Sequence, residues 1–523
     1  MSEARERGWD ELDIVIVTGD AYVDHPSFGA AVIGRQLEAA GFRVGILAQP
    51  DINSDEDYLA LGRPRLFFGV TGGNLDSLVS NYTAQRKRRN DDAYSPGGQA
   101  GLRPDRAVLA YANVLRRLFK RSVLVLGGIE ASLRRIAHYD YWQDKVRASL
   151  LSDTKADILV YGMGERAVLD IAMRLQQSAS VADLQDLPGT VAFSRDAPAK
   201  DDIVLPDNLA CHDKQVFLRM TRLFEQHHAS RVIYQQNGNR WLRHNPPAGP
   251  LTEAELDAIY ALPFAYAPHP SYKGSRIPAF EQIRDSLTSH RGCFGGCNFC
   301  ALSAHQGRRI QSRSRDSLLD EAKKIATLRG QALTITDVGG PTANMYRSIC
   351  LQGFPGDCPR PSCLYPKPCP QLRPDHRSQL ELLNALAALP EVRQVFVASG
   401  IRHDLALGSP EYIKALAARY TGGRLKLAPE HSSPAVLRLM GKPEIGLFEE
   451  FVHRYFAACK LAGVRRQVIP YIIIGHPGTT VEDALSGPIF VTHFPTPLCA
   501  LAKADPGDPR FAERFELFLG GME

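Results

Sequence analysis

The sequence predicts an α/β protein with two successive parallel-stranded units, and two observations lead to this fold class. Buried strand-like runs alternate with segments of helical apolar spacing near the N-terminus and again after residue 283. The 523 residues are also enough for two or three domains with sizeable cores. Alternating strands and helices form parallel sheets, so we expect a doubly wound, Rossmann-like sheet and then a parallel barrel, open or closed.

Strand–helix patterns support the first unit, which we expect over residues 1–183. Residues 12–21, LDIVIVTGDA, form a buried strand run, and residues 27–51 predict a helix followed by a second strand. Residues 122–136 and 156–175 repeat the order of strand, glycine turn and helix. This repetition is typical of a doubly wound sheet.

Two stretches interrupt this order. Residues 85–106 are polar and begin with the basic run QRKRR, which predicts a solvated loop; the alternative is a lid over a ligand at the strand ends. Residues 184–283 show a less regular pattern and are expected to connect the two units.

The second series of elements predicts the barrel over residues 284–485. A short strand precedes the glycine-rich segment that begins at residue 292, and four further strands alternate with helices after it. In barrels of this kind the functional loops follow the carboxyl ends of the strands, so chemistry is expected there.

Composition excludes several classes of protein. Charged residues make up 23% and hydrophobic residues 44%, an ordinary globular composition, and the net charge of +5 does not by itself indicate nucleic acid or membrane. The charged N-terminus lacks the apolar core of a signal peptide, and the longest apolar run, VIPYIIIG, is far shorter than a membrane span. Ten cysteines without a secretory start do not indicate disulfides, so we expect a reduced, cytoplasmic protein without a membrane partner.

Three of the cysteines stand together in one glycine-rich loop. Cys293, Cys297 and Cys300 are separated by three and two residues, which lets one loop bind three corners of a four-iron cluster and leaves one iron open. The glycines between them allow close backbone approach and supply amide donors. A structural zinc site, completed by His290, His305 or a distant cysteine, is one alternative. Three buried thiols without a metal are the other.

With Phe299 before its last cysteine, this loop resembles the signature of the radical S-adenosylmethionine (SAM) superfamily. The resemblance implies a partial (β/α)6 barrel with a [4Fe-4S] cluster on the three cysteines and SAM at the open iron. It also implies an electron donor such as flavodoxin or ferredoxin, and cleavage of SAM to a 5′-deoxyadenosyl radical that removes a hydrogen atom from the substrate. The protein would position the substrate and exclude water.

Segments further along the chain match the same superfamily in order. Gly339 and Gly340 resemble the glycine pair after the second strand whose carbonyls take the SAM amine. Pro341 replaces the usual acidic residue there, so no side-chain role is expected at that position. In this order after the cysteine loop, the glycine pair is a moderately specific match.

Four more positions are candidates for SAM binding through the resemblance. Phe299 would pack near the adenine, and Gly475 matches the glycine of the fifth-strand motif that cradles it. Ser399 and Glu430, at the ends of the third and fourth strands, would lie near the ribose and carboxylate of SAM. An ordinary strand terminus is the alternative for each, and no catalytic residue is indicated.

Longer stretches resemble one group, the YgiQ-type radical SAM proteins, over residues 8–485. These stretches include GGNLDSLVSNYTAQRKRRNDDAYSPGG, LGGIEASLRRIAHYDYWQDKVRASLL and HRGCFGGCNFCALSAHQGRRIQSRS. The resemblance implies a class of chemistry and names no substrate.

The first domain also resembles the cobalamin-binding-like domains that precede some radical SAM barrels. Those domains bind cobalt through the histidine of an Asp-x-His-x-x-Gly loop. Here Asp24 and His25 are adjacent and Gly29 lies one position too far along, so the motif is not met. The sequence therefore argues against cobalamin and favours a Rossmann-like scaffold with a different or lost ligand.

A second cysteine group follows the second barrel strand. Cys350, Cys358, Cys363 and Cys369 stand within twenty residues, with prolines between them and His376 nearby. Four thiols this close indicate a second cluster or a zinc ion, and free thiols are the alternative. The remaining cysteines, expected to be packing residues, are Cys211, Cys459 and Cys499.

Residues 486–523 depart from the resemblance. The stretch FPTPLCALAKADPGDPRFAERFELFLGGME resembles a fragment of class II lysyl-tRNA synthetase and is too short for an ATP or tRNA site. We expect a chimeric or truncated chain without synthetase activity, in which residues 488–494 have the strand character to fill the sixth position of the barrel.

Three functions compete. A radical SAM enzyme of unknown substrate is the leading hypothesis. A nucleic-acid-associated, RNA-modifying protein is the second, supported by the basic runs at 85–89 and 307–315. A non-catalytic iron–sulfur scaffold is the third.

Overall fold

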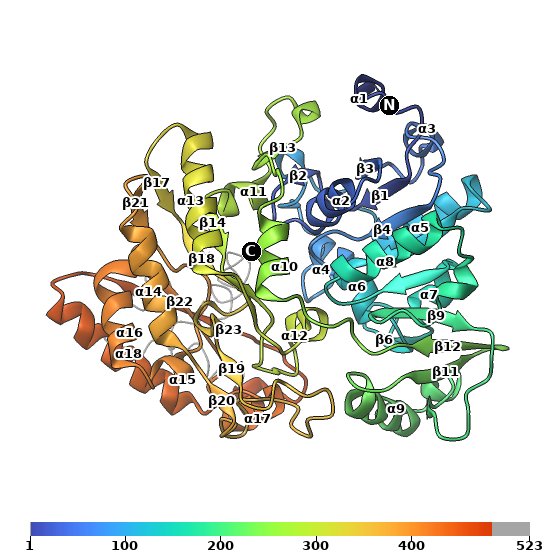
Figure 1. The fold of residues 1–523 in the computed structure, drawn as a ribbon. Helices are drawn as coiled ribbons and strands as arrows, with labels where there is room; N and C mark the ends of the chain where they lie inside the picture. The colour runs from blue at the N-terminus through green and yellow to red at the C-terminus, as the bar shows by residue number, and fades with distance from the viewer. Residues whose placement is uncertain (1, 484–523) are drawn as a thin grey trace. The chain divides into compact units, whose positions relative to one another are not determined.

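The computed structural model describes residues 2–483, which form two compact units (Figure 1). The first unit comprises residues 2–284 with the short stretches 304–307 and 355–359, and the second comprises the other described residues. The expected synthetase-like segment at 486–523 and the expected strand at 488–494 lie outside the described residues. Within residues 2–483, none of the helices combines the length and hydropathy of a membrane span.

The first unit is built on a nine-stranded sheet whose strand order is β10-β11-β12-β9-β8-β5-β4-β1-β3. Its five strands from β3 to β8 are parallel, and their spatial order is that of a doubly wound sheet with a topological switch point between β1 and β4. The α/β fold predicted for this region is confirmed. The parallel strands are β1 (Ile14–Thr18), β3 (Val44–Ala48), β4 (Phe67–Thr71), β5 (Val123–Gly127) and β8 (Ile158–Val160).

Both faces of this sheet are buried. In β1, Val15 and Val17 belong to one apolar cluster, whereas Ile14 and Ile16 belong to the cluster on the other face. Successive side chains of a strand point to opposite faces, so a continuous apolar strand needs helices on both sides. The helices that supply residues to these clusters are α2 (Gly29–Ala39) and α8 (Glu165–Gln176) on one face, and α5 (Ala107–Leu118), α6 (Gly128–Leu133) and α7 (Leu150–Thr154) on the other.

The stretch 184–283, expected to connect the two units, instead extends the same sheet, and the chain divides at residue 284. β11 and β12 form an antiparallel hairpin in which Asn237 pairs with Arg240 around a two-residue loop. Gly238, the first of the two loop residues, has φ +61°, and glycine at that position is a usual signal for such a turn. The added strands are β9 (Thr190–Ser194), β10 (Ile203–Leu205), β11 (Ile233–Asn237) and β12 (Arg240–His244), with α9 (Lys214–His227) between β10 and β11.

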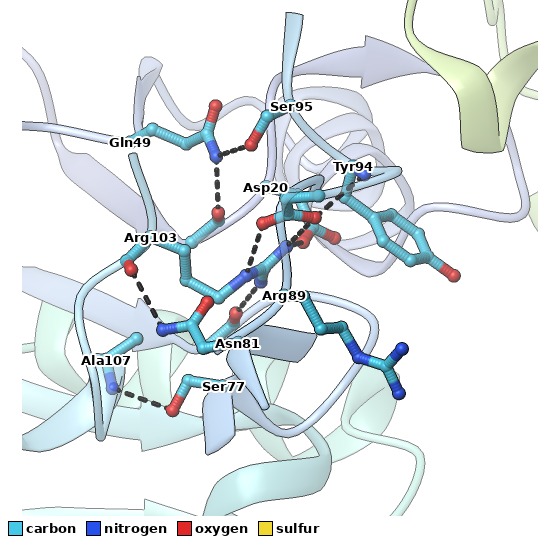
Figure 2. Close-up of polar contacts among 12 residues, drawn as sticks. Asp20, Gln49, Ser77, Asn81, Arg89, Tyr94, Ser95, Arg103 and Ala107 are labelled. Carbon is cyan, nitrogen blue, oxygen red and sulfur yellow. Dashed lines mark hydrogen bonds and ion pairs between the residues drawn. The ribbon is translucent and has the colours of Figure 1, made fainter. Parts of the chain in front are cut away.

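A buried ion-pair network fills the switch point between β1 and β4 (Figure 2). Arg103 is 0% exposed and lies 2.7 Å from the Asp20 carboxylate and 3.0 Å from that of Asp92. Asn81 donates a hydrogen bond to the Arg103 carbonyl at 3.1 Å. Burial raises the pKa of Asp20, and the charge of Arg103 opposes that rise. Because Asp92, Ser95 and Arg103 of the 85–106 loop are buried, the prediction of a solvated loop is wrong at these positions.

The second unit contains the five strand positions predicted for the barrel. Among the described residues every pairing between these strands is parallel, including a bridge from Ile401 to Leu427. The strands are β14 (Ser286–Thr288), β17 and β18 (Leu333–Ile335 and Asp337–Gly339), β21 (Val392–Val395), β22 (Arg424–Glu430) and β23 (Gln467–Ile472). The helices between them include α13 (Arg315–Arg329), α14 (His376–Ala387), α16 (Pro410–Ala415) and α18 (Ile445–Leu461).

Replacement of Arg103 by methionine is expected to destabilise the first unit strongly. The change leaves the Asp20 and Asp92 carboxylates buried without their cation, which costs about 3–5 kcal/mol of unfolding free energy. Urea unfolding followed by circular dichroism measures the loss. Arg117→Met is the matched control, because Arg117 and its partner Asp55 are 55% and 47% exposed, and little change is expected. Equal effects of the two substitutions would contradict a structural role for the network.

Candidate metal centre

The cysteine loop is closed at its base and anchored at its tip. β15 (His290–Arg291) pairs antiparallel with β16 (Gln311–Ser312), and the loop with the three cysteines lies between them. At the tip, the backbone N–H of Asn298 donates to the Met440 carbonyl at 3.0 Å, and its side-chain amide donates to the Leu439 carbonyl at 2.8 Å. Both carbonyls belong to the end of α17 (Pro434–Met440). The loop is therefore held at two points within the second unit.

Two neighbouring glycines shape the loop. Gly296 has φ +62° and no room for a side chain, because a Cβ there would lie 2.7 Å from the Pro361 carbonyl. A Cβ at Gly295 would be in ordinary contact with two thiols, 3.4 Å from the Cys293 sulfur and 3.8 Å from the Cys297 sulfur. The backbone at Gly295 therefore lies close to the thiols, as a cluster-binding loop requires.

Each of the first two thiols has a polar neighbour at its sulfur. Arg402 Nη1 donates to Cys297 Sγ at 3.7 Å, and Thr342 Oγ1 lies 3.7 Å from Cys293 Sγ. Burial raises the pKa of the Cys300 thiol, whose backbone N–H donates to the Cys297 carbonyl at 3.1 Å. Hydrogen bonds to ligand sulfurs and nearby charge tune an iron–sulfur cluster, so these neighbours suit the expected group.

Two buried cations stand near the loop, and the sequence analysis missed both. Arg402 is 6% exposed and binds Asp404 through two hydrogen bonds of 2.9 and 2.6 Å. Burial alone would raise the pKa of Asp404, but the Arg402 guanidinium holds it well below its usual value. Lys442 is buried as well, and its ammonium donates to the Ala428 carbonyl at 2.6 Å and lies 3.8 Å from Glu430.

The glycine pair predicted to bind SAM is tightly packed. A Cβ at Gly339 would lie 2.5 Å from Ser399 Oγ, and a Cβ at Gly340 would lie 2.7 Å from the His290 imidazole. The Gly339 carbonyl already accepts hydrogen bonds from Ser289, at 2.8 Å from the backbone N–H and 3.0 Å from the hydroxyl. The structure therefore brings Gly339 and Ser399 together, as predicted for two parts of one site.

An aspartate that the sequence analysis did not identify joins the second and third strands. The Asp337 carboxylate accepts hydrogen bonds from the backbone N–H groups of Ala398 and Ser399 at 2.7 and 3.0 Å, and another from the Ser399 hydroxyl. Ser399 is thus fixed by a neighbour in β18. The acidic residue in the motif TDVGGPT was the available signal, since a polar side chain at a barrel-strand end often serves the site.

Phe299 lies beside the fifth-strand motif. It is 37% exposed, and its ring meets the His476 ring edge-on with centroids 6.3 Å apart. His476 directly follows Gly475, which has φ +83° and nothing within 4 Å of a Cβ built on it. The structure thus brings two predicted adenine contacts to one place.

Glu430 ends β22 in an uncommon backbone conformation, with φ +72°. Its carbonyl accepts a hydrogen bond of 2.8 Å from the Ile473 N–H, at the start of the fifth-strand motif. Burial raises the pKa of the Glu430 carboxyl, and Lys442 opposes that rise. A non-glycine residue held at positive φ is typical of a functional site.

The alternative zinc ligands have other partners. His290 is buried, with Nε2 3.0 Å from the Thr342 carbonyl and Nδ1 2.9 Å from Ser289 Oγ, and burial lowers its pKa to about 4. His305 Nδ1 lies 2.9 Å from Ser132 Oγ in the first unit. Both imidazoles are therefore engaged away from the thiols.

Three members of the second cysteine group lie in neighbouring segments of the second unit. The Cys369 N–H donates to the Cys363 carbonyl at 2.7 Å, and Cys350 pairs with Leu372 between β19 (Ile349–Cys350) and β20 (Leu372–Arg373). Cys363 is buried in an apolar cluster with Phe294, and its N–H donates to the Phe294 carbonyl at 3.2 Å. This packing holds Cys363 against Phe294 of the cysteine loop, so Cys363 has a structural role.

Within residues 2–483, no three histidine, cysteine, aspartate or glutamate side chains are grouped closely enough to hold a single metal ion. The structure therefore gives no support to zinc on either cysteine group. A four-iron cluster is different, because each thiolate binds its own iron and the three need not converge on one atom.

Two family models match the chain. The Radical SAM N-terminal model matches residues 1–286, and the Radical SAM superfamily model matches residues 287–486. Together with the cysteine loop on a parallel α/β unit, these matches define a radical SAM enzyme, and the corresponding prediction is confirmed.

Curated relatives give the family. A UPF0313 protein of Rhodopseudomonas palustris is 48% identical, covering 93% of this chain and 76% of the relative. One of Methanocella arvoryzae is 49% identical, covering 92% and 82%. The chain therefore belongs to the UPF0313 family, which confirms the predicted YgiQ-type membership.

Solved structures share the fold. The radical SAM methyltransferase TsrM of Kitasatospora setae, solved with cobalamin and a [4Fe-4S] cluster bound, has a TM-score of 0.52 at 17% identity, covering 92% of this chain and 72% of that one. The cobalamin-dependent SAM radical enzyme OxsB, solved without ligands, has a TM-score of 0.50 at 11% identity, covering 98% and 55%.

The sequence argument against cobalamin is therefore wrong, because the fold of this chain is one that holds cobalamin in TsrM. The argument used the spacing of one loop, and a fold can keep its ligand without that spacing. In this chain His25 is buried, with Nδ1 accepting from the Ser27 N–H at 3.1 Å and the ring packed against Tyr266 and Phe280. His25 is thus a core residue, and we derive no step through cobalamin.

Replacement of Gly340 by alanine is expected to disturb the base of the cysteine loop. The added Cβ would overlap the His290 ring, which costs about 1–3 kcal/mol of unfolding free energy and lowers the iron bound after reconstitution. Gly446→Ala is the control, since nothing lies within 4 Å of a Cβ at Gly446 in α18. Denaturant unfolding and iron analysis measure both effects. Equal iron content in the two variants would show that the contact does not position the loop.

Proposed function

We propose that Cys293, Cys297 and Cys300 hold a [4Fe-4S] cluster whose open iron binds SAM. The observation that supports this best is three thiols on one anchored glycine loop, with polar neighbours at two of the sulfurs. Bound there, the cluster supplies the electron that cleaves SAM to a 5′-deoxyadenosyl radical for hydrogen abstraction from a substrate.

The adenine of SAM is proposed to lie at Phe299 and Gly475. The ring of Phe299 and the neighbouring His476 present an aromatic wall, and the absence of a side chain at Gly475 leaves the backbone open to a flat ligand. An adenine that lies there keeps the sulfonium end of SAM within the second unit.

The amine and ribose of SAM are proposed to lie at the ends of the second and third strands. Both lone pairs of the Gly339 carbonyl accept from Ser289, so Gly340 is the member of the pair whose carbonyl suits the SAM amine. Ser399 and Glu430 are proposed to lie in the surroundings of the SAM ribose and carboxylate. The Asp337 carboxylate fixes Ser399 by a hydrogen bond, and the buried Lys442 lies near Glu430.

The buried guanidinium of Arg402 is proposed to balance the negative charge of the thiolates. A charge in a low-dielectric interior needs a partner, and Arg402 is shared between Asp404 and the Cys297 sulfur. Because Asp404 takes part of the charge of Arg402, only the remainder is available to the thiolates.

A reducing, cytoplasmic setting and a flavodoxin- or ferredoxin-type electron donor complete the proposal. Among residues 2–483 the nine cysteines form no disulfide bond, as such a compartment allows. A cluster that must receive one electron at a time requires a one-electron donor.

Replacement of the three loop cysteines by alanine is expected to abolish cluster binding. After anaerobic reconstitution, the unchanged chain should bind about four irons and the triple variant none, because three thiolate ligands are lost. Iron, zinc and sulfide analysis with a visible spectrum measures this. Cys350→Ala is the control and should bind iron as the unchanged chain does. Addition of SAM should alter the electron paramagnetic resonance of the reduced cluster, and 5′-deoxyadenosine should form with a reductant.

Iron retained in the triple variant at the level of the unchanged chain, or zinc in place of iron in the unchanged chain, would refute the assignment. A smaller amount of metal in the triple variant that is lost on further removal of Cys350 would instead support a second site.

Replacement of Arg402 by glutamine is expected to lower the reduction potential of the reconstituted cluster. The change removes a positive charge beside Cys297, which makes the added electron less favourable. Arg402→Lys keeps the positive charge and should leave the reduction potential close to that of the unchanged chain. Arg438→Gln, at an exposed position on α17, should leave the reduction potential unchanged. A redox titration followed by electron paramagnetic resonance measures all three variants. An unchanged potential in Arg402→Gln would exclude the proposed charge balance.

A further inference from the structure

Two segments of the first unit that are distant in sequence form one exposed surface rich in cations and aromatic rings. One segment follows α4 (Ser77–Asn81), and the other is the hairpin of β6 (His138–Asp140) and β7 (Lys145–Arg147). Both segments carry the resemblance to the YgiQ-type group, and the cysteine chemistry uses neither. We call this the basic–aromatic surface; its members are Tyr82, Arg86, Lys87, Arg88, Tyr139, Tyr141, Trp142 and Lys145.

Direct contacts join the two segments. Arg86 Nη2 donates to the Tyr141 carbonyl at 2.6 Å, and the guanidinium carbon stands 4.4 Å from the centroid of the Tyr141 ring. In return, the Tyr141 hydroxyl donates to the Ala84 carbonyl at 3.2 Å. These reciprocal bonds span a sequence separation of 55 and 57 residues, so the surface is built by the fold.

The aromatic rings are set at angles and remain accessible. Tyr141 and Trp142 meet edge-on at 5.2 Å, and Tyr82 meets Trp142 at 6.0 Å. Tyr139 and Tyr141 are 49% and 47% exposed. Large rings so exposed in a soluble fold commonly mark a binding surface.

The cations of the surface are not neutralised locally. In the part of the chain that the structure describes, Arg86, Lys87 and Arg88 form no ion pair with a carboxylate. Of the nearby acids, Asp140 is paired with Arg106 at 2.6 Å. Asp105 and Asp144 accept hydrogen bonds of 2.6 and 2.5 Å from the hydroxyls of Tyr82 and Tyr139, which bring no opposing charge. The four cations of the surface outnumber these two carboxylates, so its net charge is positive.

The second basic run of the sequence does not form such a surface. Arg313, in its centre, has a side chain only 1% exposed and is paired with Glu321. Its guanidinium also donates to the hydroxyl of Ser317 at 2.7 Å. This run is in part structural, so it does not support phosphate binding.

We propose that the basic–aromatic surface binds single-stranded nucleic acid. Lys87, Arg88 and Lys145 would contact phosphates, and the exposed rings of Tyr139 and Tyr141 would stack on unpaired bases. A duplex keeps its bases stacked on one another, so these rings favour a single strand. The surface can serve this role whether or not a cluster is bound.

The test uses the full chain and a fluorescently labelled single-stranded RNA of about twelve nucleotides, a length that such sites commonly cover. Fluorescence anisotropy gives the affinity at a series of salt concentrations. The variant Arg86→Gln/Lys87→Gln/Arg88→Gln should bind about tenfold or more weakly at low salt, and its slope of log affinity against log salt should fall by about 2. Tyr139→Leu should weaken binding about fivefold or more through lost stacking and leave the slope unchanged.

The matched control is Lys214→Gln/Arg219→Gln/Arg222→Gln, which removes the same charge from exposed positions on α9. It should bind the RNA as the unchanged chain does. Equal losses in the two triple variants would overturn the proposal, because they would show an effect of net charge alone. Equal affinity for a duplex of the same sequence, or for vesicles with anionic lipid, would also overturn it. Absence of RNA binding would refute this proposal and leave the cluster assignment untouched.

Discussion

A buried guanidinium beside a thiol is the contact on which the arrangement of the second unit depends. Arg402 follows the third strand, yet its side chain reaches the sulfur of Cys297 in the loop after the first strand. Its backbone N–H donates a hydrogen bond of 2.8 Å to the side-chain oxygen Oδ1 of Asn344, which follows the second strand. One residue thereby contacts segments that follow three different strands, and movement of the loop would break the contact between Arg402 and the Cys297 sulfur.

The features that the sequence could predict are those encoded by residues close to one another in the chain. The five strand positions of the second unit and the parallel core of the first were visible because each strand and helix carries its own periodicity. The cysteine loop was visible because its ligands are close in sequence. Phe299 and Gly475 were identified by motif order, and the structure places Phe299 against the residue next to Gly475.

The features that the sequence did not predict depend on contacts between distant residues. The strands β9 to β12 join the first sheet partly by antiparallel pairing, which no local period reveals, although Gly238-Asn239 marks one of the turns. Arg402 and Lys442 were missed because charged side chains are expected at the surface, and only the fold buries them. The prediction that cobalamin is not bound depended on the spacing of one loop, whereas the similarity to TsrM extends over the whole fold.

The network around Arg103 gives the 85–106 segment two opposite characters. Its first residues face solvent, while Asp92, Ser95 and Arg103 are enclosed. Surface connections usually accept insertions and are cut readily by proteases. The 85–106 segment is held by the buried side chains of Asp92, Ser95 and Arg103. Proteases should therefore cleave it mainly in its basic first residues. An insertion near Asp92 should destabilise the fold, as an insertion in a core element does.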